Sequence, residues 1–516
     1  MRAFAMALLV TFGLVFANDS WSESIDARGT DTGPATSGYE AADPDFRLYR
    51  QKLAAAHALA RADQHAGADR ALATLIADPK FGALSTSDQR ATLSAAGWAA
   101  VKLDRLEDAR DLYLRATAIG PEDPDDWYRL STLEWDLKHV DASAAALTHF
   151  TERWPELLTN VDVDYLLRLV RELDPGSQTR LNLLQAMFDA NWENKQGGAS
   201  SVWFALALAQ IERGDAEAAM AAIKRVVSPS HLIKLRSDKR FDALVTSDAW
   251  TFNVEHAARR QAEELQLQVS LDPSTLDKQV QLSYAMLTAG MNEEVIALAD
   301  SAVAKIASAP ADAPPFTDIG NQVWLMNNRA IALRRTGLVD EALAELLRGS
   351  QLDEDGQVNV SQALNLGQFY CSLNRPDEAL AAIGKVGLMS GYGRLVQASV
   401  QQRAALQQGD AAGAARALAY IREHREDSQT LLLEALIEAG HLADAARAIT
   451  ELLTSPYERP ELLEWLQEYR MAPVLPGDER ARANRKALLA RPDLQEAVMR
   501  VGRIQQYGIY GSYGME

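Results

Sequence analysis

The sequence is poor in cysteine, in aromatic residues and in basic charge. Its single cysteine, Cys371, excludes an internal disulfide. Lysine and arginine number 52 against 71 aspartates and glutamates, so the formal net charge is -19. A surface of this charge repels phosphate backbones and anionic lipid. The composition therefore excludes a disulfide scaffold and predicts that nucleic acid is not a partner.

The sequence also lacks the motifs of the common active sites. It contains no G-x-S-x-G, H-E-x-x-H, P-loop or G-x-G-x-x-G pattern. Its eight histidines are scattered, and none stands three or four residues from another, as two metal ligands on one helical face would. We therefore expect no catalytic residue, no cofactor and no metal ion.

Long apolar runs are missing except at the start of the chain. Arg2 precedes an apolar run over residues 3–17, which is shorter than the roughly 20 residues that span a bilayer. This arrangement is typical of a secretory signal peptide, with cleavage expected after Ala17, and it predicts an exported protein, periplasmic or associated with the cell envelope. An uncleaved N-terminal anchor is the alternative. We expect no transmembrane segment in the mature chain. Residues 18–45, rich in Ser, Thr, Gly and Asp, predict a flexible linker.

What is abundant is alanine-rich helical periodicity. From about Phe46 onward, apolar residues return every three or four positions, with almost no alternating pattern of the kind strands show. Gly, Asp and Pro punctuate the pattern every 12 to 18 residues or so, as in antiparallel helix pairs. The chain is predicted to be all-α.

One stretch of sequence is nearly repeated. "NNRAIALRRTGLVDEALAEL" covers residues 327–346 and "NLGQFYCSLNRPDEALAAI" covers residues 365–383, which places Ala342 and Ala379 37 residues apart. A period near 34 residues, with small residues at two fixed places, resembles the tetratricopeptide repeat (TPR). Matching small or apolar residues recur in about eight copies between residues 90 and 459, among them Gly97, Ala109, Tyr113, Leu206, Ala219, Gly290, Ala330, Gly337, Gly367, Gly409 and Gly440.

This resemblance implies an α-solenoid of helical hairpins that winds into a right-handed superhelix with a concave inner surface. We expect an N-terminal array over residues 46–306, with a basic, turn-rich insertion near 228–250 that breaks the repeat. A proline-rich connection over 307–319, interpreted either as a hinge or as a surface loop, leads to a C-terminal array over 320–459.

The end of the chain departs from the repeat. Capping helices are predicted over 460–506, the last of them over 492–506. A Tyr/Gly tail follows over 507–516, and glycine between the tyrosines favours a flexible or extended tail over a helix. Docking onto another surface and disorder are the two alternatives for this tail.

The resemblance also implies a binding groove. In the TPR family the first helix of each hairpin lines the groove, and an asparagine there often holds the backbone of an extended peptide. Carried over in register, that place is Gln281, Asn328 and Asn365, with Trp324 and Arg334 on the same surface. An amide side chain can donate and accept together, which suits an extended ligand. The alternative is that these amides are solvated helix residues.

A second candidate surface lies in the N-terminal array. In the same register Trp98, Tyr128 and Trp135 point into the groove, where large rings commonly mark contact hot spots. The same rings could stack on a sugar, and ordinary packing between hairpins is the alternative.

Two functions follow from these expectations. The favoured one is a non-enzymatic protein–protein interaction scaffold in the bacterial cell envelope, binding an extended peptide or protein segment in its groove. The alternative is an accessory subunit of an envelope polysaccharide or secretion machine, with glycan or membrane-protein contacts. An enzyme would need catalytic residues in the irregular stretches 161–192 or 228–250.

Overall fold

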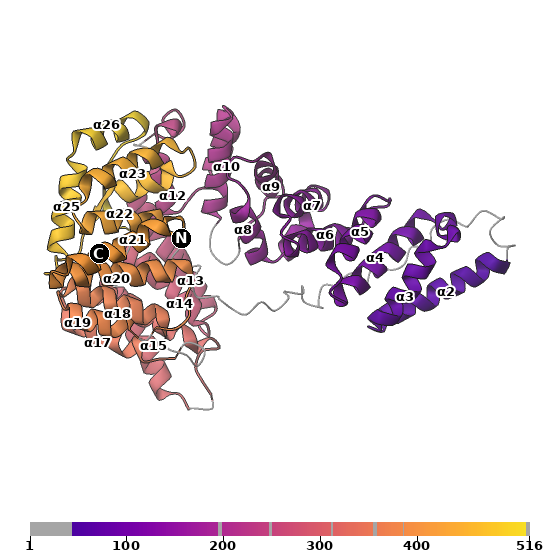
Figure 1. The fold of residues 1–516 in the computed structure, drawn as a ribbon, viewed down its shortest axis with the longest axis horizontal. Helices are drawn as coiled ribbons and strands as arrows, with labels where there is room; N and C mark the ends of the chain where they lie inside the picture. The colour runs from indigo at the N-terminus through magenta and orange to yellow at the C-terminus, as the bar shows by residue number, and fades with distance from the viewer. Residues whose placement is uncertain are drawn as a thin grey trace. The chain divides into compact units, whose positions relative to one another are not determined.

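The protein is an array of short antiparallel helices (Figure 1). The structure is a computed structural model that describes residues 44–194, 199–246, 250–310, 313–353, 359–384 and 386–511. The predicted signal peptide and nearly all of the predicted linker lie outside these residues. Within them, most helices pack chiefly on helices that are next, or next but one, in sequence, and the predicted all-α solenoid is confirmed.

The chain divides into two compact units between Arg225 and Val226. The described part of the N-terminal unit begins at Pro44. Its helices are α2 (Pro44–Arg61), α3 (His65–Ala77), α4 (Thr86–Lys102), α5 (Leu106–Thr117), α6 (Pro124–Asp136), α7 (Val140–Arg153), α8 (Val163–Glu172), α9 (Gln178–Asp189), α10 (Ser200–Glu212) and α11 (Ala216–Ile223), with 3-10 turns η2 (Pro79–Ala83) and η3 (Pro155–Asn160).

Close packing within a hairpin depends on the small residues of the repeat. A Cβ atom built on Gly97 of α4 would lie 2.9 Å from the ring of Tyr113 in α5, a separation that real Cβ atoms essentially never show. Tyr113 itself is fully buried. The glycine therefore lets the two helices of this hairpin approach each other at the place where the repeat pattern predicts a small residue.

The C-terminal unit continues the array and adds a short sheet. Its helices are α12 (Pro229–Ser237), α13 (Val254–Leu271), α14 (Leu276–Ala289), α15 (Asn292–Ser308), α16 (Gln322–Arg335), α17 (Val339–Ser350), α18 (Val360–Ser372), α19 (Pro376–Ile383), α20 (Gly391–Gln408), α21 (Ala411–Glu423), α22 (Gln429–Glu438), α23 (Leu442–Thr454), α24 (Arg459–Leu466), α25 (Glu479–Leu489) and α26 (Pro492–Val501). Its 3-10 turns are η4 (Lys239–Phe241), η5 (Trp250–Phe252), η6 (Ile319–Asn321) and η7 (Arg425–Asp427), and its strands are β1 (Glu468–Arg470) and β2 (Gln506–Tyr510).

The two ends of this second array meet. The predicted insertion near 228–250 forms α12 and η4, and α12 packs against α24, more than 200 residues away in sequence. The ammonium group of Lys234 in α12 lies 2.6 Å from Glu461 Oε1 and 3.3 Å from Glu464 Oε2. The stretch that breaks the repeat thus closes the C-terminal unit.

The described residues of the proline-rich connection belong to the C-terminal unit. This connection is fastened to the start of α14. The two carboxylate oxygens of Asp318 accept hydrogen bonds from the backbone N–H groups of Leu276 (2.7 Å) and Asp277 (2.8 Å). A side chain from a distant loop thereby satisfies two of the free N–H groups at a helix N-terminus.

The C-terminal residues extend the departure from the repeat. The predicted helix over 492–506 ends at Val501, and residues Gln506–Tyr510 form β2, which pairs parallel with β1 and lies against α13 and α14. The side chains of Tyr507 and Tyr510 are 3% exposed. This part of the tail is therefore extended and docked, while Tyr513 lies outside the described residues.

Candidate binding surfaces

The asparagines predicted to hold a peptide hydrogen-bond with one another. Asn365 Nδ2 in α18 donates to Asn327 Oδ1 in α16 at 3.0 Å, and Asn327 Nδ2 donates to Asn328 Oδ1 at 3.4 Å. Asn328 Nδ2 in turn donates to Ser283 Oγ in α14 at 2.7 Å. Asn328 is fully buried, whereas Asn365 is half-buried. This chain of hydrogen bonds joins α14, α16 and α18, and Asn328 presents no surface to an external ligand.

The other predicted groove residues also have partners within the chain. Gln281 Nε2 donates to Asp277 Oδ2 one turn earlier in α14, at 2.7 Å. Trp324 is half-buried and packs on the cluster that contains Phe316. Arg334 is 5% exposed, and its Nη2 lies 3.1 Å from Asp478 Oδ2. Arg334 therefore meets an acidic group on the predicted surface, and the group comes from the same chain.

Asp478 ends a turn, residues 476–478, that lies on the inner face of the C-terminal unit just before α25. We define this inner face by Arg334 of α16, Cys371 of α18, and Arg403 and Gln407 of α20. The second carboxylate oxygen of Asp478 lies 2.7 Å from Arg403 Nη2. Bidentate capture of one carboxylate by two guanidinium groups gives strong, charge-assisted hydrogen bonds.

The backbone of the same segment lies directly on α18. Gly477 N donates to the carbonyl oxygen of Ser372 at 2.8 Å, and a Cβ atom built on Gly477 would lie 1.9 Å from the carbonyl oxygen of Cys371. That carbonyl also accepts from Gln407 Nε2 at 2.7 Å. Only glycine fits this contact, and Leu475 two residues earlier is buried. Residues 475–478 thus lie on the inner face as a turn that leads into α25.

The terminal strand β2 covers a second part of the array. The Arg335 guanidinium carbon in α16 lies 3.8 Å from the centroid of the Tyr510 ring, a cation–π contact. Arg335 Nη1 also donates to the carbonyl oxygen of Leu287 at 2.8 Å. Burial lowers the pKa of Arg335 to about 10, so the guanidinium remains charged at neutral pH. The cation that faces Tyr510 is therefore held in a low-dielectric site.

The sequence pattern did not reveal the residues that fill the inner face. Asp478 and Gly477 lie in "MAPVLPGD", residues 471–478, which has no helical periodicity. The available signal was the pair of prolines in this stretch, since proline excludes a regular helix and favours extended backbone. Nothing in the spacing shows that its target is the array 70 to 140 residues earlier in the chain.

The predicted aromatic patch of the N-terminal unit consists of Trp98, Tyr128 and Trp135. Tyr128 is 6% exposed, and its ring centroid lies 5.9 Å from that of Phe150 and 6.5 Å from that of Tyr165. Tyr128 is therefore packed between helices, which was the alternative to a binding surface. Trp135 is half-buried with its ring edge-on to Tyr165, at a centroid distance of 5.9 Å.

Trp98 is the second half-buried ring of the patch. Lys102 Nζ and Arg129 Cζ each lie 4.5 Å from its ring centroid. Cations at this distance are attracted to the electron-rich ring face. Trp98 and Trp135 thus keep part of their surface exposed, Trp98 beside two cations and Trp135 beside an aromatic ring.

Acidic groups border this patch at the start of α6. Arg90 Nη1 lies 2.8 Å from Asp126 Oδ2 and 2.9 Å from Asp123 Oδ2, so these two carboxylates share one cation. Asp125 stands between them in sequence. Burial raises the pKa of Asp125 to about 6, although the charge of Arg129 opposes the shift. Asp125 therefore titrates in a range where an ordinary aspartate is fully ionised.

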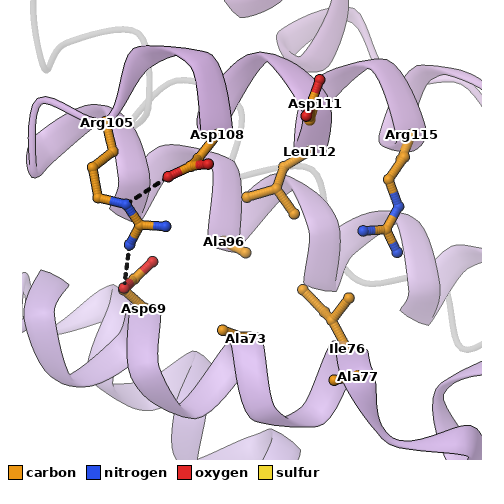
Figure 2. A pocket seen from close by; sticks show the side chains of 10 residues that line it. All are labelled: Asp69, Ala73, Ile76, Ala77, Ala96, Arg105, Asp108, Asp111, Leu112 and Arg115. Carbon is orange, nitrogen blue, oxygen red and sulfur yellow. Dashed lines mark hydrogen bonds and ion pairs between the residues drawn. The ribbon is translucent and has the colours of Figure 1, made fainter.

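A shallow groove lies between α3 and α5, with Ala96 of α4 at its floor (Figure 2). It encloses about 390 Å³. Figure 2 shows Arg105 of α5 joined to Asp108 on its own helix and to Asp69 of α3, with Nε to Asp108 Oδ2 at 2.8 Å and Nη1 to Asp69 Oδ2 at 2.7 Å. The ion pairs tie the two helices together across the groove, and none of its ten lining residues is a Ser, Thr, Cys or His.

Within the described part of the chain, no group of three or more His, Cys, Asp or Glu side chains could hold a metal ion. None of the helices over these residues has both the length and the apolar character needed to cross a bilayer. Cys371 is fully buried, and burial raises the pKa of its thiol to about 11, as expected for a packed residue and not for a nucleophile.

Comparisons with known proteins add little to this picture. No protein-family model matches the chain, and no curated protein matches it. Among solved structures, the chain is similar to the crystal structure of the APC/C hetero-tetramer Cut9–Hcn1, with 13% sequence identity over 88% of this chain and 79% of that chain and a TM-score of 0.29. It is also similar to the structure of Naa15/Naa10 bound to HypK-THB, with 12% identity, the same two coverages and a TM-score of 0.24. Likeness at this level carries no argument about function, which must come from the surfaces.

Proposed function

We propose that this protein is a non-enzymatic interaction scaffold that holds extended protein segments on its helical arrays. The observation that supports the proposal is the way in which the C-terminal unit holds its own non-helical residues 475–478. Arg334 and Arg403 bind the Asp478 carboxylate, and the Gly477 backbone lies on α18. Charge-assisted carboxylate capture and backbone contact are the interactions that an extended peptide from another protein would make.

The surface proposed for a partner is the aromatic patch of the N-terminal unit. Trp98 and Trp135 are half-buried there, so each ring still has area to lose on binding. Tryptophan contributes more binding free energy than most residues when a partner covers it. The predicted groove around Asn328 is a weaker candidate, because that side chain is fully buried and bonded to Ser283.

The proposed setting is the bacterial cell envelope. It rests on the apolar run over residues 3–17 and the small residue Ala17 at its end. The mass of the purified mature protein tests this part separately. Cleavage gives a chain that begins at Asn18, and a chain that retains Met1 contradicts cleavage.

The test of the scaffold function compares two tryptophan variants. The tagged protein captures partners from the cell that produces it, and each identified partner is then purified and titrated against the chain. We expect Trp98→Ala/Trp135→Ala to weaken binding by tenfold or more. The matched control is Trp250→Ala, which removes a 64% exposed ring from the C-terminal unit and should leave affinity unchanged.

Three outcomes separate the alternatives. Equal affinity of the wild type and the Trp98/Trp135 variant contradicts the aromatic patch as the contact. Retention of a purified envelope polysaccharide by the wild type, lost in the same variant, favours the glycan-binding alternative. Turnover of a captured molecule contradicts the non-enzymatic proposal.

A further inference from the structure

The terminal strand β2 fills a slot built from residues of the array and of β1. The backbone of β2 pairs with the backbone of β1, with Glu468 opposite Gln506 and Arg470 opposite Tyr510. Gly508 N donates to Glu255 Oε1 of α13 at 2.8 Å. These contacts are made to the backbone of β2, so they do not depend on its side chains.

Two tyrosine side chains of β2 pack against arginine and aromatic side chains. The Tyr510 ring lies between two guanidinium groups, with Arg335 Cζ at 3.8 Å and Arg470 Cζ at 5.2 Å from its centroid. It also packs against Gly290, where a Cβ atom would lie 3.5 Å from the ring and 2.9 Å from Arg470 Nη1. Since Gly290 has a φ of +81°, it supplies both the turn after α14 and the space for the ring.

The Tyr507 ring occupies the other pocket. It stacks on the Tyr469 ring at a centroid distance of 6.2 Å, and Arg236 Cζ lies 5.7 Å from its centroid. Burial raises the pKa of Tyr507 to about 12, so this phenol is neutral at physiological pH. The slot therefore accepts two aromatic rings, three residues apart, on an extended backbone.

The residues before β2 are anchored independently of it. Arg503 N donates to the carbonyl oxygen of Ser237 at 3.0 Å, and Arg503 Nη2 lies 2.5 Å from Asp242 Oδ1. Gly502 pairs with Asp238 in an isolated antiparallel bridge. These contacts hold α26 in place up to residue 503. Because β2 is the last described element of the chain, it can leave its slot without dislodging the elements before it.

We propose that this slot is a recognition site for an extended segment of a partner protein that carries aromatic residues at its first and fourth positions, and that β2 occupies it as a built-in competitor. This inference rests on the proposed scaffold function and names the chemistry of one partner. Strand pairing with β1 provides affinity that is independent of sequence, and the two aromatic pockets provide specificity. A partner segment replaces β2 by making the same contacts.

The experiment uses a chain that ends at Arg503 and a labelled peptide of residues 504–511. Fluorescence anisotropy should show saturable binding of the peptide to the shortened chain, and binding at least tenfold weaker to the intact chain, in which β2 fills the slot. A peptide with serine in place of Tyr507 and Tyr510 should not bind. Arg335→Met in the shortened chain should weaken binding about fivefold or more, whereas Arg259→Met, at an exposed position of α13, should leave it unchanged.

A full-length variant tests the same proposal without relying on the fold of the shortened chain. Tyr507→Ser/Tyr510→Ser keeps the full length but weakens the hold of β2, so the labelled peptide should bind this variant more tightly than the wild type. Three results overturn the proposal: a folded shortened chain that binds no peptide, an intact chain that binds it equally well, or a shortened chain that loses its helical circular dichroism. An intact chain that forms a dimer, where the shortened chain does not, assigns the slot to a second copy and also overturns it.

The proposed scaffold function fails or holds separately from this inference. Capture of partners by the Trp98/Trp135 surface is measured on the intact chain and does not involve β2. If the peptide does not bind but capture of partners still depends on Trp98, the recognition slot is rejected and the scaffold function is not.

Discussion

Lys234 is a charged residue at a buried position, where removing a charge from water costs free energy. Its side chain is 3% exposed, and one of its two partners, Glu464, is equally buried, while Glu461 is 60% exposed. A buried ion pair adds little net stability, but removing one member leaves the other charge without compensation. The Lys234–Glu464 pair therefore makes the closure of the C-terminal unit depend on one specific contact.

We predict that Lys234→Met destabilises the C-terminal unit by about 3–5 kcal/mol, because the buried carboxylate of Glu464 loses the cation that compensates its charge. Replacing both residues, Lys234→Met/Glu464→Met, should restore most of the loss. Pulsed alkylation of Cys371 during urea denaturation measures unfolding of this unit, since that thiol is fully buried in the folded chain. Glu461→Gln, at the exposed partner, is the control, and a single-variant loss no larger than that of the control would refute the account.

Asp125 makes the stability of the N-terminal unit depend on pH. Its pKa is about 6 in the folded chain and near 3.8 when it is unperturbed, so the folded state binds more protons between these values. Stability therefore falls as the pH rises from about 4 to about 6, and the whole penalty is present above pH 6. One pKa unit corresponds to about 1.4 kcal/mol.

We predict that Asp125→Asn stabilises the N-terminal unit at pH 7.5 by about 1–2 kcal/mol, allowing for solvent screening, and has little effect at pH 4. Urea denaturation followed by tryptophan fluorescence measures the difference, with Cys371 labelling identifying the transition of the other unit. Glu152→Gln, an exposed position in α7, serves as control. The same stabilisation at both pH values would mean that the carboxyl charge is not the cause.

At the scale of elements, two kinds of segment shape the C-terminal unit. Helical hairpins form the array, and non-helical segments without periodicity lie on it. The contact of residues 475–478 with α18 is so close that it requires a glycine, because Gly477 meets the Cys371 carbonyl oxygen. This turn is thus fitted to the array as closely as one helix is to the next.

We predict that Gly477→Ala destabilises the C-terminal unit by about 2 kcal/mol or more, because backbone atoms on both sides would have to separate. Cys371 alkylation in urea again reports the change. Gly387→Ala is the matched control, since a Cβ atom there meets no heavy atom within 4 Å. Similar behaviour of the two variants would show that residues 475–478 do not lie on α18.

The sequence predicted helices and hairpins well because their determinants are local. Small residues such as Gly97 and Gly367 and turn residues such as Gly290 recur at fixed spacing, and each acts on a neighbour within the same or the next hairpin. For the predicted aromatic patch, the sequence could not separate buried Tyr128 from half-buried Trp98 and Trp135.

The sequence could not predict contacts between residues that are far apart in the chain. Lys234 and Glu461 are 227 residues apart, and Asp478 meets Arg334 across 144 residues. Periodicity carries no information about such pairs. The amide row was expected to face a peptide, yet Asn328 is used to join two helices, because a buried amide must be paired within the protein when no ligand is present.

At the scale of the whole molecule, the C-terminal unit keeps its own strand β2, residues 506–510, bound against β1, α13 and α14. Native-state hydrogen exchange of the intact chain, read by mass spectrometry, tests this claim most directly. We predict that amides of residues 506–510 exchange at least about 100-fold more slowly than in an unstructured peptide, though faster than those of α16, because β2 opens locally. Exchange of these residues at the rate of an unstructured peptide would contradict the account.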